Sequence, residues 1–334
     1  MRHGEAELRM PGYPDPGYTS SASMLGWPRR RLRALVAPQE GAPAASAAPP
    51  AECETTPMPN PTAQVLRSRG GSLCFADFGP GDGYPVLFMH QSPGCRLSMR
   101  FPGQVAALGG RLISYDRPGC GRSTRRHGRS VADCVPDVEG VIDALGLADL
   151  AVVGYSGGAP HALAVAAGLA GRVSRVAIYG AIAPLDQLGL AEWSKEQGAD
   201  MHDFVAAVIA GEEAVTPMLV KEDAEARAAA APDDPVGAII LESTRKGAGG
   251  WIDDELAWAI PWGFDVRDVV APTWIWSNPN DTVTPPNHAA WLARTIPNAF
   301  LRTSVNALGH AAVADPEAAR AELYSWLIGN ADVT

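Results

Sequence analysis

The stretch that decides the fold is LAVVGYSGGAPHALAVAAGL, residues 150–169. Its first part, Leu150–Tyr155, is a short apolar run typical of a strand buried on both faces. Its last part, Pro160–Leu169, is a helix of small residues. Between them lies the pattern G-x-S-x-G, and a serine at such a sharp strand-to-helix turn is held in a strained backbone with its hydroxyl exposed. Ser156 is therefore the candidate nucleophile, although a glycine turn whose serine only caps the helix is the structural alternative.

Apolar runs on both sides of this stretch predict seven further strands, between which helical patterns alternate. With Leu150–Tyr155, the predicted strands are Gln64–Arg69, Ser72–Asp77, Pro85–His90, Arg111–Tyr115, Val173–Tyr179, Thr273–Ser277 and Phe300–Thr303. Helices are predicted at 131–146, at 160–169, at 287–296 and from Asp315 to Gly329. Because short apolar strands alternate with helices, the fold class is α/β, with a mostly parallel sheet of eight strands flanked by helices.

The segment 184–262 interrupts this alternation and carries Trp193, Trp251, Trp258 and Trp262. A connection this long is better explained by a helical cap than by a loop. The predicted organisation is therefore a core of 61–183 and 263–334 with a helical cap at 184–262. Trp193, Trp251 and Trp258, with Tyr155 next to the serine, are candidates for lining a substrate pocket; surface decoration is the alternative for the cap.

The first sixty residues differ in composition from the rest, with ten prolines and ten alanines and little hydrophobic periodicity. The run Arg29-Arg30-Arg31-Leu32-Arg33 invites an export-signal interpretation, but Pro38 cuts off the apolar stretch behind it. We expect residues 1–60 to be a disordered or non-native extension outside the fold, with Met58 as one possible natural start.

Composition and charge exclude several classes of protein. The 334 residues are 46% hydrophobic, which excludes wholesale disorder, and no apolar run is long enough to span a membrane. A formal charge of −10 disfavours nucleic acid as a partner and favours a small-molecule substrate. The five cysteines form no C-x-x-C pair and are odd in number, so neither a zinc site nor a disulfide framework is predicted, and the expected location is the cytoplasm. The sequence gives no oligomeric state.

A serine nucleophile requires a base and an acid that orients the base. His310 follows the last predicted strand by seven residues and is the candidate base, because the other histidines after Ser156 outside the cap, His161 and His288, lie in predicted helices. Asp281 follows the strand TWIWS in a turn-rich loop and is the candidate acid. Its rival is Asp186, which follows an earlier strand, and an Asx turn is the structural alternative for Asp281.

The negative oxygen formed during acyl transfer requires two backbone N–H donors. Gly157, directly after the serine, is the candidate for one donor. The other is expected from the loop after Pro85–His90, from either Ser92 or Gln91. His90 is interpreted as a residue that holds this loop, or as a histidine satisfied in the core. Asp116, in the turn DRPGCGRS (116–123), is expected to brace loops through hydrogen bonds.

These motifs together resemble the α/β-hydrolase superfamily, in its serine esterase and peptidase-like branch. The resemblance covers about 64–329 and rests on HQSPG (90–94), YDRPGCGRS (115–123), GYSGG (154–158), the Asp281 loop and GH (309–310), with WGFDVRDVVAPTWIW (262–276) as the return from cap to core. One departure is Gln91, where relatives commonly have glycine; a positive φ there would strain glutamine.

The resemblance implies a serine hydrolase that uses Ser156, His310 and Asp281 and no metal or organic cofactor. A carboxylic ester or lactone is the favoured substrate class. The alternatives are a lyase or cyclase on the same scaffold, an iminopeptidase- or amidase-like enzyme, and a ligand receptor that retains the three residues.

Overall fold

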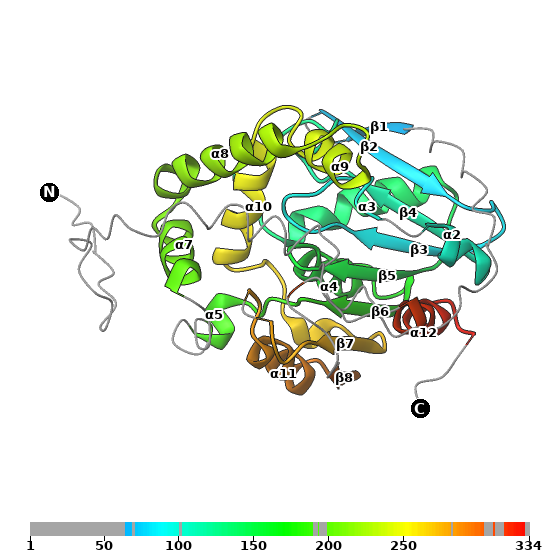
Figure 1. The fold of residues 1–334 in the computed structure, drawn as a ribbon. Coiled ribbons are helices and arrows are strands. Elements are labelled where there is room, and N and C mark those ends of the chain that lie inside the picture. The colour runs from blue at the N-terminus through cyan, green and yellow to red at the C-terminus, as the bar shows by residue number, and fades with distance from the viewer. Residues whose placement is uncertain are drawn as a thin grey trace, which may run out of the picture.

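A single sheet of eight strands organises the fold, in the order β1-β2-β4-β3-β5-β6-β7-β8 (Figure 1). The computed structural model describes residues 64–68, 71–99, 102–189, 193, 199–281, 283–303, 310 and 317–330. The strands are β1 (Gln64–Ser68), β2 (Gly71–Phe78), β3 (Tyr84–Met89), β4 (Gly110–Tyr115), β5 (Leu150–Tyr155), β6 (Val173–Tyr179), β7 (Thr273–Ser277) and β8 (Ala299–Thr303). Only β1–β2 and β2–β4 pair antiparallel; the other pairs are parallel. The predicted fold class and all eight predicted strands are confirmed.

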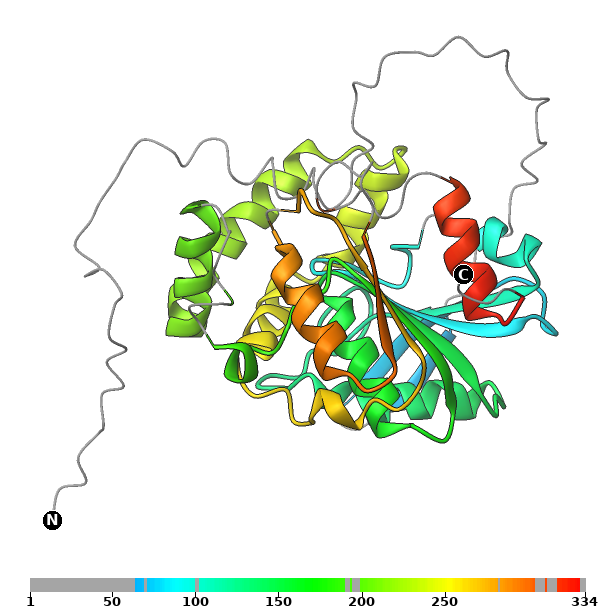
Figure 2. The same cartoon turned by 90° about the horizontal axis from the view of Figure 1, so that it is seen from below.

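Helices cover both faces of the sheet (Figure 2). One face packs against α3, α4 and α11, and the other against α2 and α12. These helices are α2 (Pro102–Ala107), α3 (Val135–Ala144), α4 (Gly158–Gly168), α11 (Pro286–Thr295) and α12 (Glu317–Leu327), with the 3₁₀ turns η1 (Ala132–Cys134) and η2 (Val266–Asp268). Helix α2 is short and had no periodic signal in the sequence.

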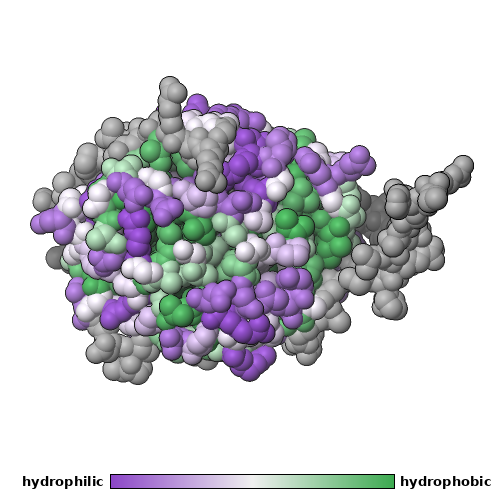
Figure 3. Space-filling view, turned by 180° about the vertical axis from the view of Figure 1, so that it is seen from behind, coloured by the Kyte–Doolittle hydropathy of each residue, from purple (hydrophilic) through white to green (hydrophobic). Residues whose placement is uncertain are grey.

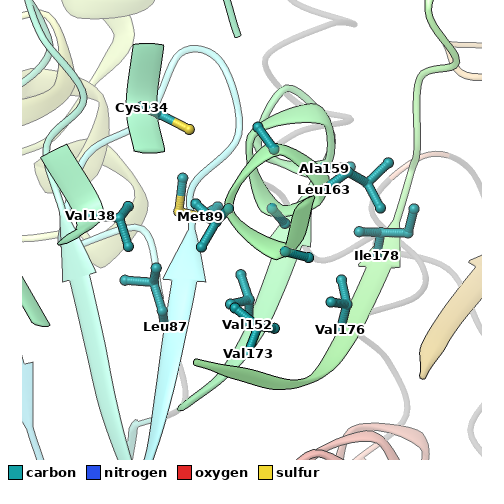
Figure 4. Packing of buried hydrophobic residues seen from close by; sticks show 14 of the residues in the cluster. Leu87, Met89, Cys134, Val138, Val152, Ala159, Leu163, Val173, Val176 and Ile178 are labelled. Atoms are coloured by element: carbon teal, nitrogen blue, oxygen red, sulfur yellow. The ribbon is translucent and has the colours of Figure 1, made fainter. Parts of the chain in front are cut away.

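Alternate residues of each central strand enter opposite cores. In β5, Val152 packs with the α3 and α4 side, whereas Val153 packs with the α12 side. Figure 4 shows the first of these cores, where Leu87, Val152 and Val176 from neighbouring strands face Leu163 of α4. Burying each such side chain contributes about 1.5–3 kcal/mol, so this alternation fixes the register of the strands.

The segment between β6 and β7 forms a layer of helices, which we call the inserted helices. They are α5 (Leu185–Leu188), α7 (Ala199–Ala210), α8 (Glu212–Ala229), α9 (Pro235–Ser243) and α10 (Gly249–Ala259). They have a third apolar cluster of their own and lie beside one end of the sheet (Figure 1). These helices lie within 184–262, the range for which a cap is predicted. The predicted extension, residues 1–60, lies outside the described residues.

One face of the molecular surface mixes residue types. The face opposite to that of Figure 1 alternates hydrophobic with hydrophilic residues (Figure 3). Over the described ranges, no helix has both the length and the apolar character needed to cross a membrane.

Candidate active site

The serine turn has the strained geometry that its sequence predicts. Ser156 has φ 51° and is the one non-glycine residue with positive φ in the described part of the chain. Its N–H donates to the carbonyl of Tyr179 (2.9 Å). The turn is too crowded for side chains on either side, since a Cβ on Gly154 would lie 2.7 Å from the Cβ of Ala162 and one on Gly158 would collide with the carbonyl oxygen of Met89. The glycines therefore let β3, β5 and α4 meet around the serine.

The structure brings Ser156, His310 and Asp281 together, although they are far apart in sequence. Nε2 of His310 lies 2.8 Å from Oγ of Ser156, and Nδ1 of His310 lies 2.7 Å from Oδ2 of Asp281. All three residues are buried. Asp186 is exposed at the start of α5, and His310 contacts Asp281 instead. The geometry is that of a hydroxyl, a base and an orienting acid joined by two consecutive hydrogen bonds.

Asp281 is both an Asx-turn residue and the partner of His310, because its two oxygens divide these tasks. Oδ1 accepts the N–H groups of Val283 and Thr284, at 2.9 Å each. Oδ2 accepts the Thr284 hydroxyl (2.8 Å) and faces His310. Burial raises the pKa of Asp281, but His310 and these hydrogen bonds outweigh burial and hold the pKa below its usual value. The acid is therefore ionised and fixed in direction.

The loop after β3 approaches the serine turn at Ser92. A Cβ on Gly157 would lie 3.2 Å from the backbone N of Ser92 and 2.5 Å from its Oγ. Within the described ranges, the N–H groups of Gly157 and Ser92 donate to no other group. Ser92 lines the pocket described below, whereas Gln91 does not, so the geometry favours Ser92 over Gln91 as the second donor. The strain considered for Gln91 is absent, because its φ is not positive.

A buried ion network, which sequence reasoning missed, holds this loop from the side of the inserted helices. Arg117 is fully buried and pairs with Asp254 of α10 (Nη2 to Oδ2, 2.6 Å). Its guanidinium also donates to the carbonyls of His90 and Gln91 and to the Ser92 hydroxyl (3.0 Å). The Ser92 hydroxyl donates in turn to Asp254 (2.7 Å), and Arg129 pairs with the other Asp254 oxygen.

Charge pairing keeps this network ionised. Burial raises the pKa of Asp254, but Arg117 and Arg129 outweigh burial and keep the pKa well below its usual value. The signal in the sequence was only the motif that contains Arg117, because the partner Asp254 lies 137 residues away. Asp116 braces loops as expected, since it accepts from Arg96 and from the N–H of Arg122.

Two buried histidines hold backbone carbonyls of the site, His161 in the serine turn and His90 in the loop after β3. His161 shares a hydrogen bond between its Nδ1 and the carbonyl of Gly157 (2.8 Å), and His90 does so with the carbonyl of Gln91 (2.7 Å). Burial, reinforced by the nearby Arg117, lowers the pKa of His161 to about 3 and that of His90 well below its usual value. Both histidines therefore hold backbone carbonyls, and neither lines the pocket described below.

A pocket opens onto Ser156 between the sheet and the inserted helices. It holds about 460 Å³ of space free of atoms, its open mouth included. One side of the pocket is formed by loops of the core. We call this side the floor; it comprises Ser92, Ser156, Gly157, Val283 and Thr284. Its other side is formed by side chains between Trp193 and Trp258 in the sequence. We call this side the roof; it comprises Trp193, Met201, Phe204, Glu255 and Trp258. Ile182 and His288 complete the lining.

Two of the four residues predicted to line the pocket do so. Trp193 and Trp258 belong to the roof, where their rings stack with centroids 5.0 Å apart. Tyr155 is outside the lining because its ring stacks on Tyr179 (4.7 Å). Trp251 is outside because it is buried behind Glu255, to which its indole N–H donates. Glu255 itself was missed, since an acid on a predicted helix is more often exposed.

No cluster suited to a metal ion is found in the described portion of the chain, where His, Cys, Asp and Glu nowhere gather in threes with ligand geometry. The described cysteines, Cys74, Cys95, Cys120 and Cys134, are buried and unpaired with one another.

Comparison with known proteins places the chain in a family. The family model for the alpha/beta hydrolase fold matches residues 84–315. A curated relative, a non-heme haloperoxidase from Rhodococcus erythropolis, is 36% identical over 126 residues, which cover 36% of this chain and 44% of the relative. The match thus spans less than half the length of that relative.

Solved structures agree on the fold. A bromoperoxidase from Bacillus anthracis superposes with a TM-score of 0.61 at 19% identity, covering 80% of this chain and 99% of that one. An esterase from Exiguobacterium antarcticum superposes with a TM-score of 0.59 at 22% identity, with coverage of 80% and 99%. At these identities the likeness concerns the fold alone. Because the family model covers well over half of its residues, the chain belongs to the alpha/beta hydrolase fold family.

Proposed function

We propose that the protein is a serine hydrolase that cleaves a small carboxylic ester or lactone through an acyl-enzyme. The observation that carries the proposal is the hydrogen-bonded chain from Ser156 through His310 to Asp281, which ends in a pocket. The family, together with the fold shared with an esterase, supports hydrolysis as the reaction type.

In the proposed first half-reaction, Oγ of Ser156 attacks the acyl carbon while Nε2 of His310 takes the hydroxyl proton. The carbonyl π electrons move to the oxygen, which the N–H groups of Gly157 and Ser92 stabilise. The intermediate collapses when the bond to the leaving alcohol breaks and His310 returns its proton to that alcohol. Asp281 orients the imidazole and stabilises its positive charge throughout.

In the second half-reaction, water attacks the acyl carbon and His310 takes one of its protons. The bond from the acyl carbon to Oγ of Ser156 then breaks, Oγ regains a proton from His310, and the carboxylic acid leaves. Because the roof residues line the same pocket as Ser156, we also propose that 184–262 acts as a substrate-selecting cap on a core of 61–183 and 263–334.

The test is labelling of Ser156 by a fluorophosphonate probe, compared between the wild-type protein and Ser156→Ala. We expect the variant to fold, as judged by circular dichroism, and to lose labelling and turnover. Labelling that persists in Ser156→Ala would reject Ser156 as nucleophile. Turnover in ¹⁸O-water separates hydrolysis from a lyase or cyclase reaction, because only hydrolysis places solvent oxygen in the acid product.

A second candidate is perhydrolysis, favoured by the relatives named as haloperoxidases. Hydrogen peroxide would replace water as the nucleophile on the acyl-enzyme, giving a peroxy acid, which then oxidises halide. The proposal predicts that bromination of a dione by the protein requires peroxide, bromide and a short carboxylic acid or ester together. Bromination that survives in Ser156→Ala would exclude this route.

A further inference from the structure

The peptide unit that joins Gln91 to Ser92 carries the N–H assigned above as the second donor to the negative oxygen. This peptide bond is trans, so the carbonyl of Gln91 and the N–H of Ser92 lie in one plane and point in opposite directions. A group that holds the carbonyl therefore also sets the direction of the N–H. Two side chains contact this carbonyl oxygen, Arg117 through Nη2 (3.1 Å) and His90 through Nδ1 (2.7 Å).

The tautomer of His90 follows from its other neighbour. Nε2 of His90 lies 3.3 Å from the backbone N of Arg117, whose N–H can only donate, so Nε2 is the acceptor. Burial and the nearby Arg117 lower the pKa of His90 well below its usual value, which keeps the ring neutral. A neutral imidazole carries one N–H, which is therefore at Nδ1 and donates to the carbonyl of Gln91.

The guanidinium of Arg117 is a rigid support because each of its nitrogens is engaged. Nε lies 3.0 Å from Oδ1 of Asp254, and Nη2 lies 2.6 Å from Oδ2, which is the forked geometry of a bidentate pair. Nη1 donates to the carbonyl of His90, and Nη2 also donates to the Ser92 hydroxyl (3.0 Å). One planar group thus contacts three consecutive residues of the loop after β3 and one residue of α10.

The opposite side of the same peptide faces the reacting serine. Ser92 lines the pocket together with Ser156, and its N–H has no acceptor within the described ranges. A Cβ on Gly157 would lie 3.2 Å from the N of Ser92, so the two proposed donors are adjacent. A donor stabilises the negative oxygen only when it is aimed at the position of that oxygen, so rotation of this peptide would remove one of the two donors.

We propose that Arg117 is a positioning residue that holds the carbonyl of Gln91 and thereby aims the N–H of Ser92 at the negative oxygen. This inference rests on the proposed function and deepens it. Arg117 is fully buried and acts through the backbone of the loop. Because its partner Asp254 belongs to α10, the inserted helices take part in stabilising the transition state without contacting the reacting atoms.

The test observes the negative oxygen directly, with benzyl trifluoromethyl ketone that carries ¹³C at its carbonyl. Under the proposed function, Oγ of Ser156 adds to this carbon, its proton passes to His310, and the carbonyl oxygen becomes the negative oxygen of a hemiketal. The ¹³C chemical shift, followed against pH, gives the midpoint at which this oxygen takes up a proton. Arg117→Met is compared with the wild-type protein.

The matched control is Arg125→Met. Arg125 also pairs with an acid of α10, since its Nε lies 2.8 Å from Oδ2 of Asp253. In the described part of the chain, its hydrogen bonds go to Asp253 and Glu212 and not to the loop 90–92.

In Arg117→Met the midpoint should move to higher pH, because a poorly aimed donor stabilises the negative oxygen less. For phenyl acetate, kcat should fall about 10- to 100-fold while KM changes by less than about 3-fold, as for an interaction made only in the transition state. Arg125→Met should change neither the midpoint nor the kinetics. An unchanged midpoint in Arg117→Met would overturn the positioning role, whatever happens to kcat.

If circular dichroism shows that Arg117→Met does not fold, Arg117→Lys replaces it. Lysine keeps the charge that Asp254 requires but lacks the fork that reaches the carbonyls and the acid together. The midpoint should move in the same direction by a smaller amount, and an unchanged midpoint in this variant would likewise overturn the role.

A crystal structure of the folded Arg117 variant shows the orientation of the peptide without any reaction. We expect the carbonyl of Gln91 to turn and the N–H of Ser92 to leave the pocket. Absence of a hemiketal in the wild-type protein would count against Ser156 as nucleophile and hence against the proposed function. A peptide that keeps its orientation in the variant would overturn the positioning role by itself.

Discussion

The floor of the pocket consists of loops that end parallel strands, whereas its roof consists of side chains from helices inserted between β6 and β7. The floor is mostly polar. Ser156 has a strained backbone there, and its hydroxyl is oriented by a hydrogen bond to His310. The roof is aromatic and is held by ring stacking around one carboxylate. Under the proposed function, this difference would place reaction type and substrate choice on separate parts of the chain, so each part can be perturbed separately.

The largest effect is expected next to the floor, at the acid that contacts His310. Asp281→Asn should lower kcat for a simple ester by about 10⁴-fold, because the amide no longer holds His310 in its productive tautomer. Asp186→Asn, at an exposed position, is the control and should leave steady-state kinetics unchanged. Full activity in Asp281→Asn together with a loss in Asp186→Asn would move the acid to Asp186.

A second prediction concerns the link between floor and roof. Asp254→Asn leaves Arg117 and Arg129 buried without their anion and should lower the free energy of unfolding by about 3–5 kcal/mol. Asp253→Asn is the matched control on the same helix, since Asp253 is equally buried but pairs with Arg125, whose side chain is 31% exposed. Its cost should stay near 1 kcal/mol or below.

Urea denaturation followed by circular dichroism measures both values. Equal losses in the two variants would mean that the Asp254 network does not join the floor to the roof more strongly than the peripheral pair.

A third prediction uses pH to measure how much His161, which holds the carbonyl of Gly157 in the floor, contributes to stability. The folded pKa of His161 is about 3, below the value of about 6.5 in an unfolded chain, so the unfolded state binds the proton first. The stability that neutral His161 provides is complete above pH 6.5 and is lost as the pH falls toward 3. Between pH 7 and pH 5 the loss should be about 2 kcal/mol for this histidine.

His161→Met should make the free energy of unfolding less dependent on pH over this window. The depressed pKa values of Asp254 and Asp281 act at lower pH, below about 4, and do not confuse the comparison. An identical pH dependence in the wild-type protein and in His161→Met would contradict the lowered pKa of His161.

The smallest effect is expected at the roof. Trp258→Phe keeps an aromatic ring, although a smaller one, and removes the N–H that donates to Glu255. Loss of one buried hydrogen bond should cost about 1–2 kcal/mol of stability and leave kcat for an uncharged ester unchanged. Thermal unfolding and steady-state kinetics on methyl isobutyrate check both parts. A large fall in kcat would show that roof and floor are not separable.

The same division explains how much could be predicted from the sequence. All eight strands were predictable because their apolar runs are local patterns, and the sheet order then brings the ends of β5, β7 and β8 together. Ser156, Asp281 and His310 follow those ends, so their positions in sequence indicated their positions in space.

The roof was less predictable, because its geometry depends on how helices pack. The tryptophan content indicated a pocket. No local pattern, however, indicated that Trp258 lines the pocket whereas Trp251 donates to Glu255 and is outside the lining. Asp254 was missed for a related reason, since its partner Arg117 is distant in sequence and the pairing exists only after the inserted helices pack on the core.

Three consecutive acids on α10 have a consequence for protein engineering. Asp253 binds Arg125, Asp254 binds Arg117 and Arg129, and Glu255 binds two indoles of its own helix. The first two acids thus need arginines that belong to the core, between β4 and α3. Grafting 184–262 onto another hydrolase would therefore require 117–129 to be transferred as well. The transferable unit is discontinuous in the gene, although it is one block in space.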